Sequence, residues 1–126
     1  MTRSTLAFVA ALVACVTVSL AAHHSPIMFD RTERKTLVGT VVEFAWTNPH
    51  ASIQLDVEAE DGTTVRWGVE LGSPNSMGRS GWRSNLLKPG DTVTVVVNPL
   101  KSGEPGGIFV SITLADGRSL GGRATD

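Results

Sequence analysis

Three histidines are the residues of this chain best suited to hold a metal ion. His23 and His24 are adjacent near the amino terminus, and His50 lies further along. If a leader peptide is removed after Ala21, His24 becomes the third residue of the mature chain. Its imidazole, the free amine and two backbone amides can then surround Cu(II) or Ni(II) in a square plane, the geometry that these ions favour. The sequence therefore predicts copper as a cofactor, with His23, His24 and His50 as the metal residues.

A cut after Ala22 would create a different chelate. His23 would then be the first residue, and its amine and ring nitrogen can chelate copper, with His24 or His50 completing the set. Zinc fits less well, because a structural zinc site needs four ligands. A blue-copper site is excluded, because its cysteine thiolate is missing from the mature chain. The competing interpretation needs no metal: the paired histidines belong to a solvated arm, and His50 closes a corner by hydrogen bonding to the backbone.

An export signal at the amino terminus decides which chelate can form. Arg3 supplies a positive charge, residues 6–20 form an apolar run, and Ser19 and Ala21 are small residues at the positions that a signal peptidase reads. The apolar run is shorter than the roughly 20 residues that a bilayer-spanning helix needs. We therefore predict a signal peptide over residues 1–21 and a periplasmic or secreted mature protein.

Cys15 leaves a second processing route open. Residues 12–15 match the pattern at which bacterial lipoproteins are cut and acylated. Cleavage there would leave a very short leader, and apolar residues would follow where a lipoprotein normally has a polar tether. We expect no stable membrane insertion unless the chain is lipidated at Cys15. If the signal peptide is removed instead, the only cysteine leaves with it and no disulfide can form.

Composition bounds the size of the protein and its partners. The 126 residues are 41% hydrophobic and 18% charged, which fits one small domain with a modest core. Removing a leader that contains Arg3 and no acid leaves ten basic and twelve acidic residues. Because this balance does not attract phosphate backbones, we expect no nucleic-acid partner. The expected partners are a small ligand, a metal ion or an envelope protein.

Alternating apolar residues predict five strands. In the first, Val38, Phe44 and Trp46 share one face. The Asp-Gly pair at residues 61–62 indicates a hairpin between the second and third strands, for which we expect Leu55 opposite Val69. The predicted strands lie at residues 38–46, 51–60, 65–71, 92–97 and 108–114.

The order of the elements indicates the fold. Ser73 as N-cap and Pro74 as first helical residue predict a short helix over residues 74–79. Three strands, a helical piece and two more strands is the order of an OB-fold, whereas an immunoglobulin-like or cupredoxin-like sandwich needs about seven strands. We therefore predict a mostly β protein, a five-stranded OB-fold-like Greek-key barrel with a short helical segment between strands 3 and 4. The barrel spans residues 36–120, with a flexible N-terminal arm over residues 22–35 and a disordered tail over residues 121–126.

Aromatic and acidic side chains provide the remaining candidates. OB-folds bind oligosaccharides or single strands on their second and third strands, where a tryptophan can stack on a ligand. Trp46 and Trp67 continue the apolar faces of their strands, so we place both in the core. We find no catalytic signature, because residues 78–81 lack the spacing of a nucleophile elbow. Glu70 is the carboxylate retained as a catalytic candidate, and its alternative roles are to pair with Arg66 or to be a surface charge.

Several short motifs occur together in the mature chain, and with them it resembles a known family. They are His23-His24-Ser25, Trp46-Thr47-Asn48-Pro49-His50, Trp67 with Glu70-Leu71-Gly72-Ser73-Pro74-Asn75, Gly81-Trp82 and Leu87-Lys88-Pro89-Gly90-Asp91. The chain resembles the small exported bacterial proteins grouped as domain of unknown function 6152, over nearly the whole mature sequence. The resemblance implies a periplasmic or secreted single domain, and it carries no established activity.

Together these observations predict an exported small β-barrel binding module. The most specific version of this hypothesis is that the module binds copper in the periplasm through the N-terminal histidines and His50. The alternative is a metal-free structural or protein-interaction domain of the cell envelope.

Overall fold

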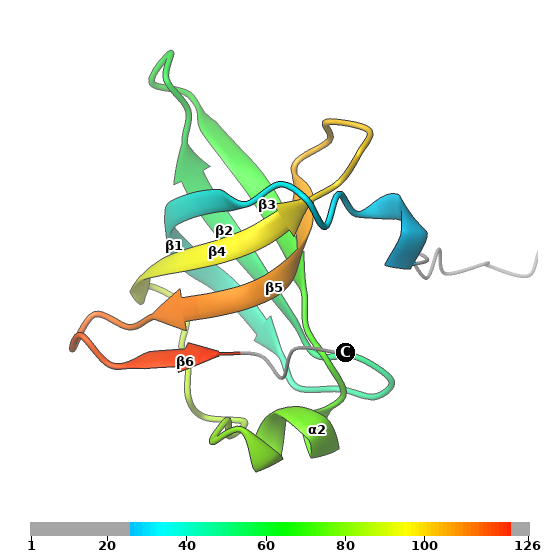
Figure 1. Ribbon diagram of the computed structural model, residues 1–126. Helices are drawn as coiled ribbons and strands as arrows, with labels where there is room; N and C mark the ends of the chain where they lie inside the picture. Colours follow the sequence, from blue (N-terminus) through cyan, green and yellow to red (C-terminus); the bar gives the residue numbers. More distant parts are fainter. Residues whose placement is uncertain (1–25, 122–126) are drawn as a thin grey trace, which may run out of the picture.

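The computed structural model describes residues 26–121, in which antiparallel strands wrap into a barrel (Figure 1). The described strands form one sheet in the order β3-β2-β1-β4-β5-β6, and an additional parallel pairing of β3 with β5 closes the first five into the barrel. Their bounds are β1 (Lys35–Ala45), β2 (Ser52–Glu58), β3 (Thr64–Glu70), β4 (Thr92–Pro99), β5 (Gly106–Thr113) and β6 (Ser119–Gly121). The predicted OB-fold-like five-stranded barrel is confirmed, and the short β6 extends the sheet beside β5.

Glycines allow the strands to close the barrel. Gly68 of β3 lies opposite Gly106 of β5. A Cβ atom on Gly106 would lie 2.7 Å from Leu100 Cδ1, and one on Gly107 would lie 2.7 Å from Val97 Cγ2. Side-chain carbons do not approach so closely without a shift, so the Gly106-Gly107 pair permits the close packing of β5 on its neighbours.

A bulge in β1 changes which residues point inward. Leu37 and Val41 are buried, whereas Val38 is 60% exposed. The pairing of β1 with β2 shifts between Val41 and Glu43, and beyond this bulge Phe44 packs against the core. We predicted Val38 and Phe44 on one face, which is wrong, because the extra residue of a bulge reverses the alternation along the strand.

The hairpin of β2 and β3 also differs from the predicted register. Leu55 lies opposite Trp67 rather than Val69. The Ala59 N–H donates to the Thr63 carbonyl at 2.7 Å, so three residues form the turn. Because the register differs by two residues, every side chain keeps its predicted face and only the cross-strand partners change.

The helix α2 (Pro74–Arg79) has the predicted bounds. The Ser73 hydroxyl accepts a hydrogen bond from the Ser76 N–H at 3.2 Å, as expected of an N-cap. Met77 of the helix is buried, and Trp82 in the loop that follows is fully buried. The helix and this loop therefore cover one end of the barrel, at the bottom of Figure 1.

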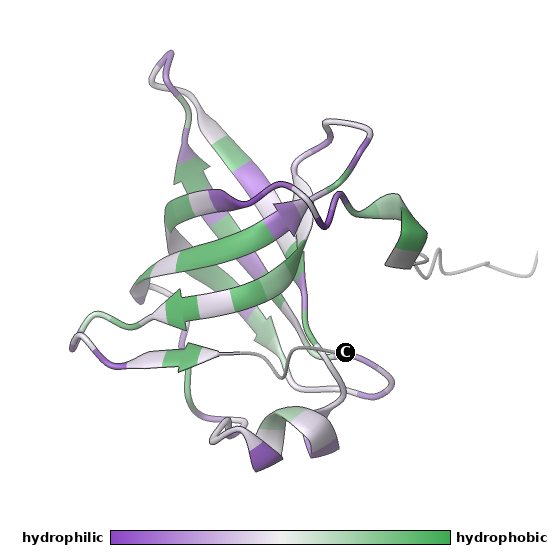
Figure 2. Ribbon diagram, in the orientation of Figure 1, coloured by the Kyte–Doolittle hydropathy of each residue, from purple (hydrophilic) through white to green (hydrophobic). Residues whose placement is uncertain are grey.

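The core lies inside the barrel. Val93, Val95 and Val97 of β4 are at most 2% exposed, as their alternation predicted. Trp67 is buried, and Trp46 is half-buried against the core. Figure 2 shows hydrophobic residues along β4 and β5 and hydrophilic residues at the tip of the β2–β3 hairpin.

A segment before β1 packs on the barrel. The 3₁₀-helix η1 (Pro26–Met28) leads into Phe29, which is 4% exposed and forms an isolated antiparallel bridge with Leu100. The Asp30 N–H donates to the Pro99 carbonyl at 2.8 Å. The amino-terminal segment therefore lies along the start of the loop that joins β4 to β5.

The predicted domain limits can be compared with these elements. The arm was expected over residues 22–35, and its described part contains the buried Phe29 and the first residue of β1, Lys35. The packing of this segment on the barrel depends on one aromatic residue, Phe29. A search for alternating apolar residues does not detect a contact made by a single residue. The tail was expected over residues 121–126, of which Gly121 ends β6 and the rest lie outside the described residues.

Candidate ligand-binding cleft

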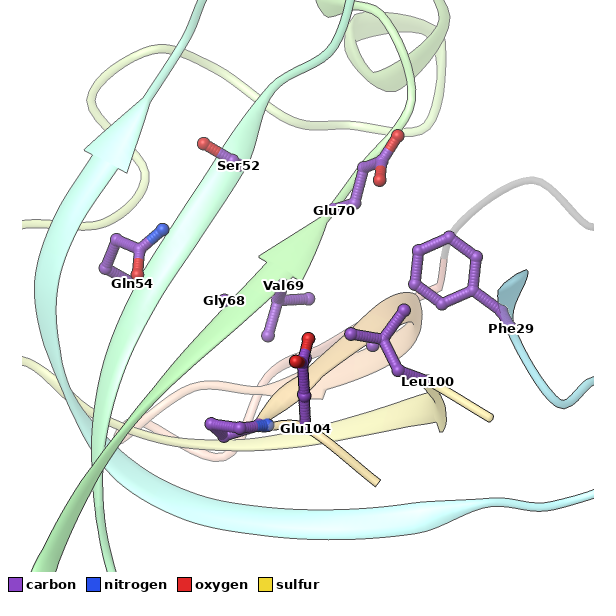
Figure 3. A pocket seen from close by; sticks show the side chains of 11 residues that line it. Phe29, Ser52, Gln54, Gly68, Val69, Glu70, Leu100 and Glu104 are labelled. Atoms are coloured by element: carbon purple, nitrogen blue, oxygen red, sulfur yellow. The ribbon is translucent and has the colours of Figure 1, made fainter. Parts of the chain in front are cut away.

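A cleft of about 570 Å³ lies over β2 and β3, beside residues 100–105 of the β4–β5 loop (Figure 3). We call it the β2–β3 cleft. Both strands, the loop and the amino-terminal Phe29 contribute to its lining. Its volume lies within the range of sites that bind small molecules in proteins.

The strands contribute polar side chains from their outer face. Ser52 and Gln54 are half-buried and alternate with the fully buried Ile53. Across the ladder, Ser52 lies opposite Glu70, and Gln54 lies opposite Gly68. A Cβ atom on Gly68 would lie 3.6 Å from Gln54 Nε2, an ordinary contact distance. The absence of a side chain at Gly68 therefore leaves space in the cleft above Gln54.

The opposite wall is apolar. Phe29 and Leu100 are 4% and 8% exposed, and Figure 3 shows their side chains near each other at one side of the cleft. Backbone bonds hold the loop in place: the Gly68 N–H donates to the Pro105 carbonyl at 3.2 Å, and the Leu100 N–H donates to the Gly106 carbonyl at 2.9 Å. The cleft thus combines an apolar wall with polar strand residues.

Two carboxylates line the same cleft. Glu70 projects from β3 and is half-buried, and Glu104 projects from the loop and is exposed (Figure 3). Within residues 26–121, neither carboxylate accepts a hydrogen bond or forms an ion pair. Both therefore remain available to a ligand.

The pairing of Glu70 with Arg66 that we considered is wrong. Arg66 pairs with Asp56 instead, with 2.5 Å between Nε and Oδ1. The hydrogen bond from this side chain to Asp56 raises the pKa of the Arg66 guanidinium above its usual value. The partner changed because the hairpin register places Asp56 directly opposite Arg66.

A second, smaller cleft lies on the other side of the same loop. It measures about 350 Å³, and Leu100 and Glu104 line both clefts. The Lys35 ammonium lies 5.0 Å from the centroid of the Trp67 ring there, a cation–π distance. The second cleft therefore already holds a cation from the chain itself.

The predicted metal residues do not meet in the described part of the chain. His50 is exposed in the corner between β1 and β2, after the cis peptide bond of Asn48-Pro49. His23 and His24 lie outside the described residues, as do the predicted signal peptide and Cys15. Between residues 26 and 121, no three His, Cys, Asp or Glu side chains are grouped to hold a metal ion. Copper binding therefore stays a prediction.

The cleft itself was only partly visible in the sequence. Glu70 was singled out, but its neighbours Phe29, Leu100 and Glu104 were not. The available signal was an aromatic residue within a polar amino-terminal segment and a Pro- and Gly-rich stretch between two strands. Neither pattern shows that the two segments meet.

No helix in the described range is long and apolar enough to cross a membrane.

Among solved structures, the barrel is similar to that of Rim1, a mitochondrial single-stranded DNA binding protein from S. cerevisiae. The TM-score is 0.50 at 14% sequence identity, and the match covers 66% of this chain and 93% of that one. At this identity the similarity shows the fold, which is the OB-fold-like barrel. No curated protein matches the chain significantly.

This similarity corrects one prediction. We expected no nucleic-acid partner from the net charge, and the exclusion is wrong, because a protein with this fold binds single-stranded DNA. Net charge is a property of the whole chain, whereas OB-folds also hold single strands by stacking bases on aromatic side chains.

The family of the chain is shown independently of this structural neighbour. Residues 10–110 match the family described as "Family of unknown function (DUF6152)", as the motifs around the histidines, tryptophans and Glu70 implied. The match covers most of the barrel, including β1 to β4 and the β2–β3 cleft. The chain therefore belongs to the DUF6152 family.

Proposed function

We propose that this chain is an exported binding module whose ligand occupies the β2–β3 cleft. The observation that carries the proposal is the cleft of about 570 Å³, which is lined by an apolar wall and by Glu70 and Glu104, two carboxylates without a partner among residues 26–121. The cleft lies where OB-folds commonly bind their ligands, over the second and third strands and beside the loop between the fourth and fifth. Export is supported by the signal-peptide pattern of residues 1–21.

The apolar wall supports binding rather than a purely structural role. Phe29 and Leu100 are held by the bridge between their backbones, so the wall is present before a ligand arrives. Pre-formed, mostly apolar sites with a few polar groups are typical of small-molecule binding. The half-buried Ser52 and Gln54 add donors and acceptors that can orient a ligand.

Filling the cleft tests the proposal. In Gly68→Leu the new Cβ meets Gln54 at an ordinary distance, so the fold should persist while the leucine occupies the cleft. Gly121→Leu is the matched control, because a Cβ atom there meets nothing within 4 Å and Gly121 does not line the cleft.

The measurement is an NMR screen of a small-molecule fragment set and of a single-stranded oligothymidylate against ¹⁵N-labelled protein. We expect some fragments to shift the amide signals of Ser52 and Gln54 in the wild type and in Gly121→Leu. The same fragments should not shift these signals in Gly68→Leu. Oligonucleotide binding that Gly68→Leu abolishes would keep the cleft as the site and make nucleic acid its ligand. Binding that Gly68→Leu leaves intact for every probe would overturn the proposal.

Copper binding is a second candidate, favoured by the position of His24. After removal of residues 1–21 this histidine is third in the chain, and the amine, two amides and its imidazole form one chelate. Native intact mass of protein exported to a bacterial periplasm, before and after about one equivalent of Cu(II), tests it. A chain beginning at Ala22 or His23 should retain one copper against a mild chelator, and acetylation of its terminus should abolish uptake.

Other results would point away from copper. An acylated Cys15, or a correct amino terminus without copper uptake, would contradict the metal site. Tight binding of an envelope protein by metal-free material would then favour the alternative, a protein-interaction domain of the envelope.

A further inference from the structure

We infer that the β2–β3 cleft selects small organic cations, in which an ammonium or guanidinium group is attached to an apolar body. The inference rests on the proposed function of this cleft and names the class of its ligand. It follows from the charges that line the cleft, from the apolar wall that lines it with them and from a cation that the chain itself holds nearby.

The charged side chains that line the cleft have one sign. They are Glu70 and Glu104, and among residues 26–121 no Lys, Arg or His lines the cleft. Lys101 precedes Glu104 in the same loop, but it lines the second cleft with Asp30 and Glu33. A cation entering the β2–β3 cleft would therefore meet two carboxylates without a competing positive group in its lining, whereas an anion would meet repulsion from both.

The apolar wall determines the rest of the ligand. Phe29 and Leu100 offer aromatic and aliphatic contact at one side of the cleft. Burying an apolar group there adds affinity in proportion to the area removed from water. A hydrated inorganic cation would leave this wall unused, so an organic cation satisfies both parts of the lining.

The second cleft holds an ammonium group beside the same loop. There the Lys35 ammonium lies 5.0 Å from the centre of the Trp67 ring, in a cleft also lined by Glu33, Leu100 and Glu104. Since Leu100 and Glu104 belong to both clefts, the same loop presents a carboxylate beside an apolar surface on its two sides. On one side the chain supplies the cation, and on the other we assign it to the ligand.

Three probes of similar shape separate charge from apolar contact. Cyclohexylmethylammonium, cyclohexylmethanol and cyclohexanecarboxylate share the ring and carry a positive charge, no charge and a negative charge. Each is titrated into the exported protein and followed by the amide signals of Ser52 and Gln54. We expect the ammonium to bind about two- to fivefold more tightly than the alcohol, because partly exposed charge pairs contribute modestly. We expect the carboxylate to bind more weakly than the alcohol.

Amide variants locate the source of the preference. Glu70→Gln and Glu104→Gln should each reduce the advantage of the ammonium over the alcohol, and together they should abolish it. Glu58→Gln is the matched control, because Glu58 is exposed at the end of β2 and does not line the cleft. This control should retain the full preference. If the preference is electrostatic, the ammonium should bind more weakly at 0.5 M salt than at low salt, whereas the affinity of the alcohol should not change.

The outcomes distinguish this inference from the proposed function. If all three probes bind equally and Gly68→Leu abolishes their binding, the cleft remains a binding site and the inference about charge is overturned. A preference for the carboxylate, or an ammonium preference that survives both amide substitutions, overturns it as well. If no probe binds in a manner that Gly68→Leu abolishes, both the inference and the proposed site fail.

Discussion

Phe29 and Leu100 form an antiparallel bridge that joins the amino-terminal segment to the β4–β5 loop, and both side chains line the β2–β3 cleft. The bridge connects residues that are far apart in the chain, and it is flanked by the hydrogen bond of Asp30 N–H to the Pro99 carbonyl at 2.8 Å. The residues that precede β1 therefore help to build the candidate site.

Removing the Phe29 ring should destabilise the barrel. Phe29 is 4% exposed, so Phe29→Ala loses buried apolar contact and leaves a cavity, and we expect the free energy of unfolding to fall by about 3 kcal/mol. Urea denaturation followed by tryptophan fluorescence measures it. Ile27→Ala is the control, because Ile27 is 75% exposed and should change stability by less than about 0.5 kcal/mol. Equal effects of the two substitutions would show that the amino-terminal segment does not pack on the barrel in solution.

A methyl group at Gly107 should be poorly tolerated. Its Cβ would lie 2.7 Å from Val97 Cγ2 and 2.9 Å from the Asn98 carbonyl oxygen. We expect Gly107→Ala to cost about 1–3 kcal/mol, the usual range for overpacking. Gly68→Ala in the facing strand is the control, because its nearest neighbour would be 3.6 Å away. The midpoints of urea denaturation compare the two variants, and a Gly107→Ala protein as stable as the wild type would contradict the close approach of β5 to β4.

The N-cap of α2 should contribute measurably to stability. Ser73→Ala removes the hydroxyl that accepts the Ser76 N–H, and we expect a loss of about 1 kcal/mol in the free energy of unfolding. Ser84→Ala changes an exposed serine outside the helix and should leave stability unchanged. Thermal or urea denaturation is sufficient, and the prediction fails if the two variants unfold at the same midpoint.

The turn between β2 and β3 should lose a stabilising interaction in acid. The Thr63 hydroxyl donates a hydrogen bond to Asp61 Oδ1 at 2.6 Å, and the Thr63 N–H donates to the same oxygen at 2.9 Å. These two hydrogen bonds lower the pKa of Asp61 from 3.8. Because the folded pKa lies below the unfolded one, this contribution is present above about pH 3.8 and is lost as the pH falls through the folded pKa.

Removing one donor tests the cause of this shift. Thr63→Val deletes the hydroxyl and keeps the shape, so the pKa of Asp61 should move back toward 3.8 but not reach it, since the backbone N–H still donates. An NMR titration of the Asp61 carboxyl carbon measures the shift. Thr64→Val alters the exposed neighbour and should leave that pKa in place. An unchanged pKa in Thr63→Val would mean that the backbone bond alone sets it.

The sequence by itself determined the features that depend on neighbouring residues. Ser73 and Pro74 placed the start of α2, because a cap and a fixed φ act within one turn. Val93, Val95 and Val97 showed the inward face of β4, because alternation is a local property of a strand. The order of the elements was sufficient for the OB-fold-like barrel, and the combined motifs were sufficient for the family.

Only the tertiary structure decided the features that depend on residues far apart. The bulge after Val41 exposes Val38, and the three-residue turn makes Asp56 the partner of Arg66. Neither follows from alternation, since a bulge or a longer turn changes pairing without changing the pattern of residue types. The β2–β3 cleft exists because Phe29 and the β4–β5 loop meet over β2 and β3, where contact is set by the closure of the barrel and not by spacing along the chain.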